Sequence, residues 1–187
     1  MGRKKAIDRE MVLNVAENLV SEKGAASLTF DAVAQAARIS KGGVQSCFGN
    51  KEALIEALLL RWTRQYENRI ATLCDRQSSP ENLVRAHIVA TFEEDESASA
   101  RTVALLAALL QSKQHLIGIK SWYKKNLSEI ERVSDESRAR ARLAFYATEG
   151  FFLLKNFGLL EVDENYSNEV LSDIMNLIKK VSDDAKP

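Results

Sequence analysis

The sequence contains little proline, glycine, cysteine or histidine. Only two of its 187 residues are proline and eight are glycine, which excludes collagen-like and low-complexity chains and disfavours a turn-rich all-β fold. The two cysteines, Cys47 and Cys74, are too few and too isolated for a disulfide framework or a zinc site. Neither histidine has a partner at metal-ligand spacing. We therefore expect a fold that needs no disulfide, metal or cofactor.

Long apolar runs are also missing. The longest wholly apolar run, residues 103–110, is far too short to span a bilayer. Asp8, Arg9 and Glu10 follow the basic N-terminus where a secretory signal needs an apolar stretch. The sequence thus predicts a soluble, cytoplasmic protein without a membrane partner.

The chain as a whole has no excess of positive or negative charge, but its two parts do. The chain has 26 basic and 26 acidic residues, so its net charge is zero. Residues 1–65 carry ten Lys/Arg and seven Asp/Glu, a net +3, and residues 66–187 carry sixteen and nineteen, a net −3. This split favours two modules with different partners.

Helical periodicity runs through almost the whole chain. In the first segment, Met11, Val15 and Leu19 fall on one helix face, and Gly24 after Lys23 is typical of a left-handed helix cap. Further helices are expected over residues 29–38, 40–47, 51–74, 80–92, 100–113, 119–132, 135–157 and 167–182, with a solvated acidic loop at 93–97. No alternating pattern predicts a strand. The expected fold class is all-α, with about nine helices.

The stretch from Thr29 to Phe48 predicts two short helices joined by a sharp turn. Thr29 and Ser40 are suitable N-caps for these helices, and Asn50 is one for the long helix that opens at Lys51. Two short helices at a sharp corner form a helix-turn-helix, in which the second helix enters the major groove of DNA. The sequence therefore predicts a DNA-binding domain near its N-terminus.

Short polar and glycine residues of the second short helix are candidate DNA contacts. Ser40, Gln45 and Ser46 have side chains that can reach phosphate oxygens and base edges. Gly42 and Gly43 are expected to let the backbone approach DNA closely.

Basic residues supply the remaining candidate contacts. Lys41 and Lys51 add charge directed at phosphates. Arg3, Lys4 and Lys5 form a basic arm of the kind that follows the DNA backbone or enters the minor groove.

Between residues 12 and 54, a set of apolar, glycine and polar residues has a combined spacing that is specific, unlike that of a lone short motif. These residues are Ala16, Leu19, Gly24, Leu28, Thr29, Val33, Ala34, Ala37, Ile39, Ser40, Lys41, Gly42, Phe48, Lys51, Glu52, Ala53 and Leu54. With them, the segment resembles the DNA-binding domain of the tetracycline-repressor (TetR) family of bacterial transcription regulators.

The resemblance implies a homodimer with an N-terminal helix-turn-helix domain and a C-terminal domain that binds a ligand and dimerises. In that family, ligand binding typically releases operator DNA. By position, Thr29 resembles a phosphate-contacting cap, residues 41–46 fall in the recognition helix, and Lys51 resembles a backbone-contacting lysine. We accordingly expect residues 1–50 to bind DNA, the helix from Lys51 to connect, and residues 66–187 to bind ligand and dimerise.

The chain departs from the family pattern at four positions. Arg38 stands where glycine is usual, Gly43 where a threonine-like residue is usual, and Gln45 where tyrosine is usual. Cys47 replaces an aromatic residue or histidine. Two adjacent glycines lower helix propensity by about 1 kcal/mol each relative to alanine, which predicts a recognition helix that is poorly ordered until DNA is bound. Gln45 offers bidentate recognition of adenine, which tyrosine does not.

A helical C-terminal domain of this size has room for a cavity with an apolar lining and few polar anchors. Core packing is the alternative for every candidate lining residue. Glu149 interrupts an apolar stretch, so it is expected to receive a cationic ligand or to pair with an arginine of the partner subunit. The candidates are Phe92, Leu106, Leu110, Trp122, Tyr123, Tyr146, Glu149 and Phe152.

The last two expected helices carry more apolar surface than one side can bury. Apolar residues between 145 and 154 occupy nearly every face of a helix, so the helix must be covered all round. A two-fold pair of such helices makes a four-helix dimer interface. The candidate interface residues are Phe145, Phe151, Leu154, Leu171, Ile174 and Ile178.

Several reactive residue types have two interpretations, and the structural one is favoured in each case. Cys47 is either a redox sensor or a half-buried filler. His87 and His115 are either ligand-binding or ordinary hydrogen-bonded histidines. The acidic run at residues 93–96 is either a cation site or a solvated loop.

The function expected from the sequence is a ligand-responsive transcriptional repressor that binds a palindromic DNA operator as a homodimer. Its effector is expected to be a small hydrophobic or cationic molecule. An enzyme is disfavoured because no nucleophile–base arrangement, phosphate-binding loop or metal-ligand pair is visible. A DNA-binding regulator or DNA organiser controlled by a protein partner stays open as an alternative.

Overall fold

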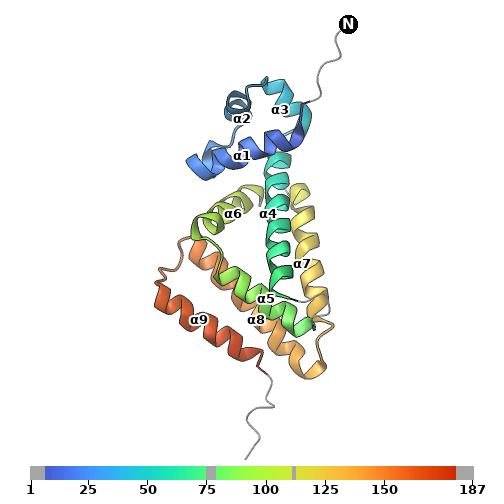
Figure 1. Cartoon of the computed structure of the whole chain (residues 1–187), viewed down its shortest axis with the longest axis vertical. Helices are drawn as coiled ribbons and strands as arrows, with labels where there is room; N and C mark the ends of the chain where they lie inside the picture. Colours follow the sequence, from blue (N-terminus) through green and yellow to red (C-terminus); the bar gives the residue numbers. More distant parts are fainter. Residues whose placement is uncertain (1–6, 75–78, 111–112, 180–187) are drawn as a thin grey trace, which may run out of the picture. The chain divides into compact units, whose positions relative to one another are not determined.

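The computed structural model describes residues 7–74, 79–110 and 113–179. Within these ranges the chain forms nine α-helices and no strand (Figure 1), so the predicted all-α fold is confirmed. The basic residues Arg3, Lys4 and Lys5 lie outside the described residues. The helices are α1 (Arg9–Lys23), α2 (Phe30–Ala37), α3 (Lys41–Phe48), α4 (Lys51–Leu73), α5 (Pro80–Phe92), α6 (Glu96–Leu109), α7 (Ile117–Ile130), α8 (Asp135–Asn156) and α9 (Glu164–Leu177), with 3₁₀ turns η1 (Ala25–Ser27) and η2 (Lys113–Leu116).

The helices belong to two compact units. The N-terminal unit comprises Met1–Trp62 with Ala100–Ile119, and the C-terminal unit comprises Thr63–Ser99 with Lys120–Pro187. The boundaries fall inside α4, α6 and α7, so these helices contribute residues to both units. This division assigns residues 100–119 to the same unit as the expected DNA-binding segment, which the sequence did not predict.

Side-chain caps begin four of the helices. Thr29, Ser40, Asn50 and Ser79 each accept a hydrogen bond from the backbone N–H three residues later, at 2.8–3.3 Å. Each cap satisfies one of the backbone N–H groups that the first helical turn leaves without a partner. The starts of α2, α3, α4 and α5 are therefore confirmed.

The acidic loop predicted at residues 93–97 is shorter in the structure, because α6 already begins at Glu96. Asp95 caps α6, because its Oδ2 accepts a hydrogen bond from the Ala98 backbone N–H at 2.9 Å. Glu96 is then in the first helical turn, where the helix dipole favours a negative charge. The helix begins four residues before the predicted residue 100 for this reason.

Arg38 forms the corner between α2 and α3. Its φ of 54° and ψ of 41° place it in the left-handed region, which costs a non-glycine residue about 1 kcal/mol. Its backbone N–H still caps α2 by donating to the Gln35 carbonyl at 3.2 Å. This conformation explains why the resembled family usually has glycine at this corner.

One apolar core holds the N-terminal unit together. Leu28, Val33 and Val44 are fully buried, and Leu54 and Leu58 from the first half of α4 are buried in the same cluster. Each Å² of apolar surface that these side chains bury contributes about 25 cal/mol to the stability of the unit. The first half of α4 is thus a structural part of the unit that contains α2 and α3.

A polar contact also fastens α4 to α1. Arg61 donates to Glu17 at 3.0 Å and to Glu10 at 2.6 Å, and the Trp62 indole N–H donates to Glu17 at 2.7 Å. The Arg61 side chain is largely buried, so solvent screens these pairs less than it screens surface pairs.

The C-terminal unit has its own core, formed where α5, α8 and α9 pack together. Ile88, Ala144, Phe145 and Ile174 lie within it. Phe145 and Ile174 were expected at a dimer interface, but they are only 2% and 4% exposed within one protomer. That expectation was wrong for these two residues, because their own subunit covers them.

Candidate nucleic-acid interface and ligand site

The recognition segment is a complete helix whose residues divide into two faces. Gly43, Val44 and Phe48 are buried in the N-terminal unit, and Gln45 and Ser46 are exposed. The exposed face of α3 also includes Lys41 and Gly42. Four of the expected DNA contacts on α3 therefore share one solvent-facing surface. That this helix is poorly ordered until DNA is bound stays a prediction.

Gly43 does not share that surface. A Cβ added to Gly43 would meet the Ile7 Cδ1 atom at 2.5 Å and the Ile39 Cδ1 atom at 3.6 Å. The prediction that this glycine lets the backbone approach DNA is corrected, because Gly43 faces side chains of its own unit. Gly42 has no atom nearer than Ser40 Oγ at 3.9 Å in the same test, so the space in front of it is open.

The candidate cations around α3 are exposed but not all unpaired. Lys41 Nζ lies 2.8 Å from Asp31 Oδ2, and both side chains are exposed. Lys51 is exposed at the first residue of α4. Thr29 is exposed, and its hydroxyl accepts the α2 capping bond while keeping its own proton to donate. A phosphate near Lys41 would compete with Asp31 for the ammonium group.

Arg9 is a cation near α3 that sequence reasoning missed. Its guanidinium carbon lies 4.7 Å from the centroid of the Phe48 ring, within the range of a cation–π contact. Arg9 is also exposed at the first residue of α1, where the helix dipole disfavours a positive charge. In the sequence, the only indication of this contact is a positive charge at a helix start, where it is unfavourable unless the side chain has another partner.

The eight candidate ligand residues are divided between the two units. Leu106 and Leu110 belong to the N-terminal unit and the other six to the C-terminal unit. Leu110 and Tyr146 are 55% and 52% exposed, so the expectation that they line an enclosed cavity is corrected. Trp122 and Tyr123 are half-buried and lie in edge-to-face contact at 4.9 Å.

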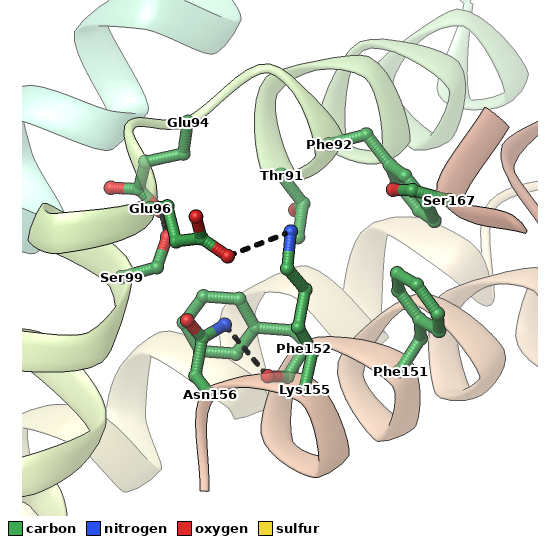
Figure 2. A pocket seen from close by; sticks show the side chains of 10 residues that line it. All are labelled: Thr91, Phe92, Glu94, Glu96, Ser99, Phe151, Phe152, Lys155, Asn156 and Ser167. Carbon is green, nitrogen blue, oxygen red and sulfur yellow. Dashed lines mark hydrogen bonds and ion pairs between the residues drawn. The ribbon is translucent and has the colours of Figure 1, made fainter. Parts of the chain in front are cut away.

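Phe92 and Phe152 line a hollow in the C-terminal unit. It contains about 330 Å³ of space, part of it open to solvent. Figure 2 shows the aromatic rings and charged groups of its lining, with Lys155 pointing toward Glu96. The full lining is Thr91, Phe92, Glu94, Glu96, Ser99, Phe151, Phe152, Lys155, Asn156 and Ser167.

The hollow has an aromatic wall and an acidic wall. Phe92 and Phe151 stack with centroids 5.1 Å apart. Lys155 Nζ lies 3.5 Å from Glu96 Oε1, and Glu94 accepts a hydrogen bond from Ser99 at 3.3 Å. Burial raises the pKa of Glu94, because a low-dielectric surrounding disfavours its charged form. A positively charged group in the hollow would favour that charged form again.

Thr91 connects the hollow to a polar cluster, which consists of Tyr66, His87, Thr91, Tyr123 and Glu149. The Tyr66 hydroxyl lies 2.6 Å from Thr91 Oγ1 and 2.9 Å from His87 Nδ1. His87 Nε2 lies 3.0 Å from Glu149 Oε1, at ion-pair distance but without hydrogen-bond alignment. The Tyr123 hydroxyl donates to the other Glu149 oxygen at 2.5 Å.

These contacts revise the interpretation of Glu149. Both of its carboxylate oxygens face groups of its own subunit, so an arginine of the partner subunit is not needed to pair it. His87 is an ordinary hydrogen-bonded histidine, as the favoured interpretation held. Sequence reasoning missed Tyr66 and Thr91, because one turn of α4 and one turn of α5 meet only in the folded unit.

The remaining reactive residues have structural partners. Cys47 is half-buried against the N-terminal core, which supports the filler interpretation. Cys74 Sγ donates to the Asn82 carbonyl at 3.5 Å, and His115 Nδ1 lies 3.2 Å from Glu56 Oε2. Among the described residues, no three or more His, Cys, Asp or Glu side chains are grouped to hold a metal ion. In the same part of the chain no helix has both the length and the apolarity to cross a bilayer.

Two family models match separate parts of the chain. The family model for bacterial regulatory proteins of the tetR family matches residues 12–58. The model for a tetracyclin repressor-like C-terminal domain matches residues 81–179. No curated protein sequence matches the chain.

Solved structures of similar fold cover almost the whole chain. The multidrug binding protein EbrR complexed with imidazole is 21% identical, covers 91% of this chain and 96% of its own, and superposes with a TM-score of 0.68. EbrR complexed with malachite green is 19% identical over 92% of this chain and 98% of its own, with a TM-score of 0.67. A transcriptional regulator from Streptomyces coelicolor A3(2) is 18% identical over 92% and 98%, with a TM-score of 0.69. These likenesses establish the fold.

The half-buried tyrosines Tyr66 and Tyr123 predict that the protein loses stability at alkaline pH. Burial raises the pKa of Tyr66 and Tyr123, and the charge of Glu149 raises both further. Because phenols of the unfolded chain ionise near pH 10, unfolding releases their protons, and stability falls as the pH rises above about 10. Urea unfolding at a series of pH values should show this fall, and it should be smaller in the Tyr66→Phe/Tyr123→Phe variant. Equal slopes in the two proteins would contradict the assignment.

Proposed function

Because the chain belongs to the tetR family of bacterial regulatory proteins, whose members are DNA-binding transcription factors and not enzymes, we propose that it is a ligand-responsive repressor. It binds a palindromic operator as a homodimer in the cytoplasm, where bacterial DNA lies. The observation that carries this proposal is the solvent-facing surface of α3, because polar side chains and an open glycine occupy it and apolar residues occupy the opposite face.

The α3 surface supports direct reading of base edges. Gln45 is exposed in the middle of the helix, and a glutamine amide can donate and accept simultaneously at the major-groove edge of adenine. Lys41 and Lys51 add contacts to phosphate, which position the helix without reading sequence. Affinity should therefore fall steeply with salt, and sequence preference should depend on Gln45.

An exposed apolar stripe on α8 supports the homodimer. Leu143, Tyr146, Leu154 and Phe157 are between 43% and 59% exposed. Their spacing of three, eight and three residues places them on one face of the helix and its end. A two-fold axis through this stripe would cover it with the same stripe of a second subunit. Of the interface residues expected from the sequence, only Leu154 belongs to this stripe.

The hollow supports a small-molecule effector. Its stacked phenylalanines suit a flat apolar group, and Glu94 and Glu96 outnumber the one lining ammonium group, Lys155. An aromatic cation combines both properties, because charge attraction is strong where water is partly excluded. EbrR has been crystallised with malachite green, which is an aromatic cation, so this dye is a suitable first probe.

The proposed mechanism is a shift between two dimer populations. Operator half-sites for such dimers are about 34 Å apart, one turn of DNA. The effector binds more tightly to a dimer whose α3 helices do not match this distance. The difference between its affinities for the two forms shifts the population toward that dimer, which releases DNA. Transcription then resumes.

Selection of duplexes from a random pool tests DNA reading. The wild-type chain should enrich a palindrome, and Gln45→Ala should reduce the preference for adenine at one position of each half-site by about 1–3 kcal/mol. Gln35→Ala is a matched control, because Gln35 is an exposed glutamine on α2. An unchanged preference in Gln45→Ala would refute the assigned contact, and an affinity insensitive to salt would refute the proposed interface.

Light scattering tests the dimer. At about 10 μM the wild-type chain should have twice its chain mass of 20.9 kDa. Leu143→Glu/Leu154→Glu should be monomeric, because two carboxylates would be buried against their own copies. Leu73→Glu replaces an equally exposed leucine of α4 and should stay dimeric. A monomeric wild-type chain would contradict the proposal.

Titration with malachite green tests the hollow. Glu94→Gln should bind the dye about tenfold more weakly, a loss of about 1.4 kcal/mol. Glu93→Gln is the control, because Glu93 is the adjacent, more exposed carboxylate and pairs with Arg69 at 3.0 Å. Dye binding that is unaltered by Glu94→Gln would mean that the cation does not use this hollow. Absence of any effector among metabolites and dyes would favour control by a protein partner.

A further inference from the structure

Lys155 is the basic side chain of the hollow in the C-terminal unit. Figure 2 shows it pointing from α8 toward Glu96 of α6. The Lys155 Nζ atom lies 3.5 Å from Glu96 Oε1, and the lysine side chain is only 29% exposed. Among the ten described residues of the lining, no other is basic. An ammonium group of the chain itself therefore faces a carboxylate that a bound cation would also face.

The same face of α8 carries part of the aromatic wall. Phe151 and Phe152 lie four and three residues before Lys155, which places all three side chains on one face of the helix. Phe151 stacks on Phe92 of α5 with centroids 5.1 Å apart. An aromatic cation against these rings would bring its charge close to the Lys155 ammonium group, and two like charges repel strongly where water is partly excluded.

The contact between Lys155 and Glu96 is weak enough to exchange. Its N–O distance of 3.5 Å is longer than the roughly 2.7–2.9 Å of a charge-assisted hydrogen bond, and the Glu96 side chain is 76% exposed. Ion pairs of this kind add little to stability. Each charge also has a favourable position without the other, because Glu96 lies in the first turn of α6 and Lys155 in the last turn of α8.

We propose that Lys155 is an internal competitor of the effector: its ammonium group holds the cation position beside Glu96 until a cationic ligand displaces it. The inference rests on the proposed binding of an aromatic cation in the hollow. The lysine side chain is long, so its charged end can turn into water while its methylene groups stay on apolar neighbours. A cation that enters then takes over the contact with Glu96.

The competition also selects among cations. A small cation without rings gains only the exchange of one ammonium contact for another at Glu96. A cation with an aromatic part gains, in addition, its contact with Phe92 and Phe151, which Lys155 does not make up for when it leaves. Lys155 thus sets the concentration of effector at which the protein responds, and it disfavours ligands that carry charge alone.

Titration with malachite green tests the competition. Lys155→Met and Lys155→Gln should each bind the dye about fivefold more tightly than the wild-type chain, because both remove the competing charge. Lys125→Met is the matched control, since Lys125 belongs to the same unit and pairs with Glu67 at 2.8 Å outside the hollow. This control should change dye binding by less than about twofold. Urea unfolding should show that all variants are folded.

A second background separates competition at Glu96 from general repulsion. In a Glu96→Gln chain the carboxylate that holds the ammonium group is gone, so Lys155→Met should tighten dye binding by less than about twofold. Equal gains in the two backgrounds would mean that Lys155 only repels the dye from a distance, and the competition would be refuted. A gain in Lys155→Met without one in Lys155→Gln would assign the effect to the apolar methionine and refute it as well.

The outcomes separate this inference from the proposed function. The wild-type chain binds the dye and Glu94→Gln weakens this binding if the hollow is the effector site. If both Lys155 variants then bind the dye as the wild-type chain does, the competition is refuted and the site stands. If neither the wild-type chain nor the Lys155 variants bind the dye, the proposed cation site and this inference are overturned together.

Discussion

Burial of the first half of α4 is the constraint on which the N-terminal unit depends. Leu54 and Leu58 lie in the same core as the buried residues of α1, α2 and α3, and three short helices have too little apolar surface to form a stable core alone. Arg61 and Trp62 add polar contacts from α4 to α1. Because α4 continues to Leu73, the helix that completes the core of one unit also contributes residues to the other.

Burial also decides which residues of α3 are available to DNA. Lys41, Gln45 and Ser46 face solvent because Val44 and Phe48 face the core, and a short helix has only these two sides. Gly43 falls on the inner side, where Ile7 covers it. The two adjacent glycines therefore differ: Gly42 leaves open space on the solvent side of α3, and Gly43 leaves room for Ile7 on the inner side.

The C-terminal unit separates a closed polar cluster from an open hollow. The Tyr123 hydroxyl donates to one oxygen of Glu149, and His87 lies at ion-pair distance from the other, so both oxygens face groups of their own subunit. Glu94 is half-buried beside Ser99 in the hollow, without an ammonium partner among the described hydrogen bonds and ion pairs. Burial disfavours the charged form of Glu94, and the charge of Arg69 offsets this effect only in part, so a cation in the proposed site would stabilise that form.

The sequence by itself determined the helices, their caps and the helix-turn-helix, because these depend on local periodicity and on residues three or four positions apart, such as Ser40 and Gly43. It did not determine which faces are covered. Phe145 and Ile174 were expected outside the protomer and lie in its core, while the exposed stripe of α8 begins at Leu143. The contacts of Ile7 with Gly43 and of Tyr66 with Thr91 join residues far apart in the chain. Only tertiary packing decides such contacts, since a helix pattern gives the spacing of its faces but not the neighbour that each face meets.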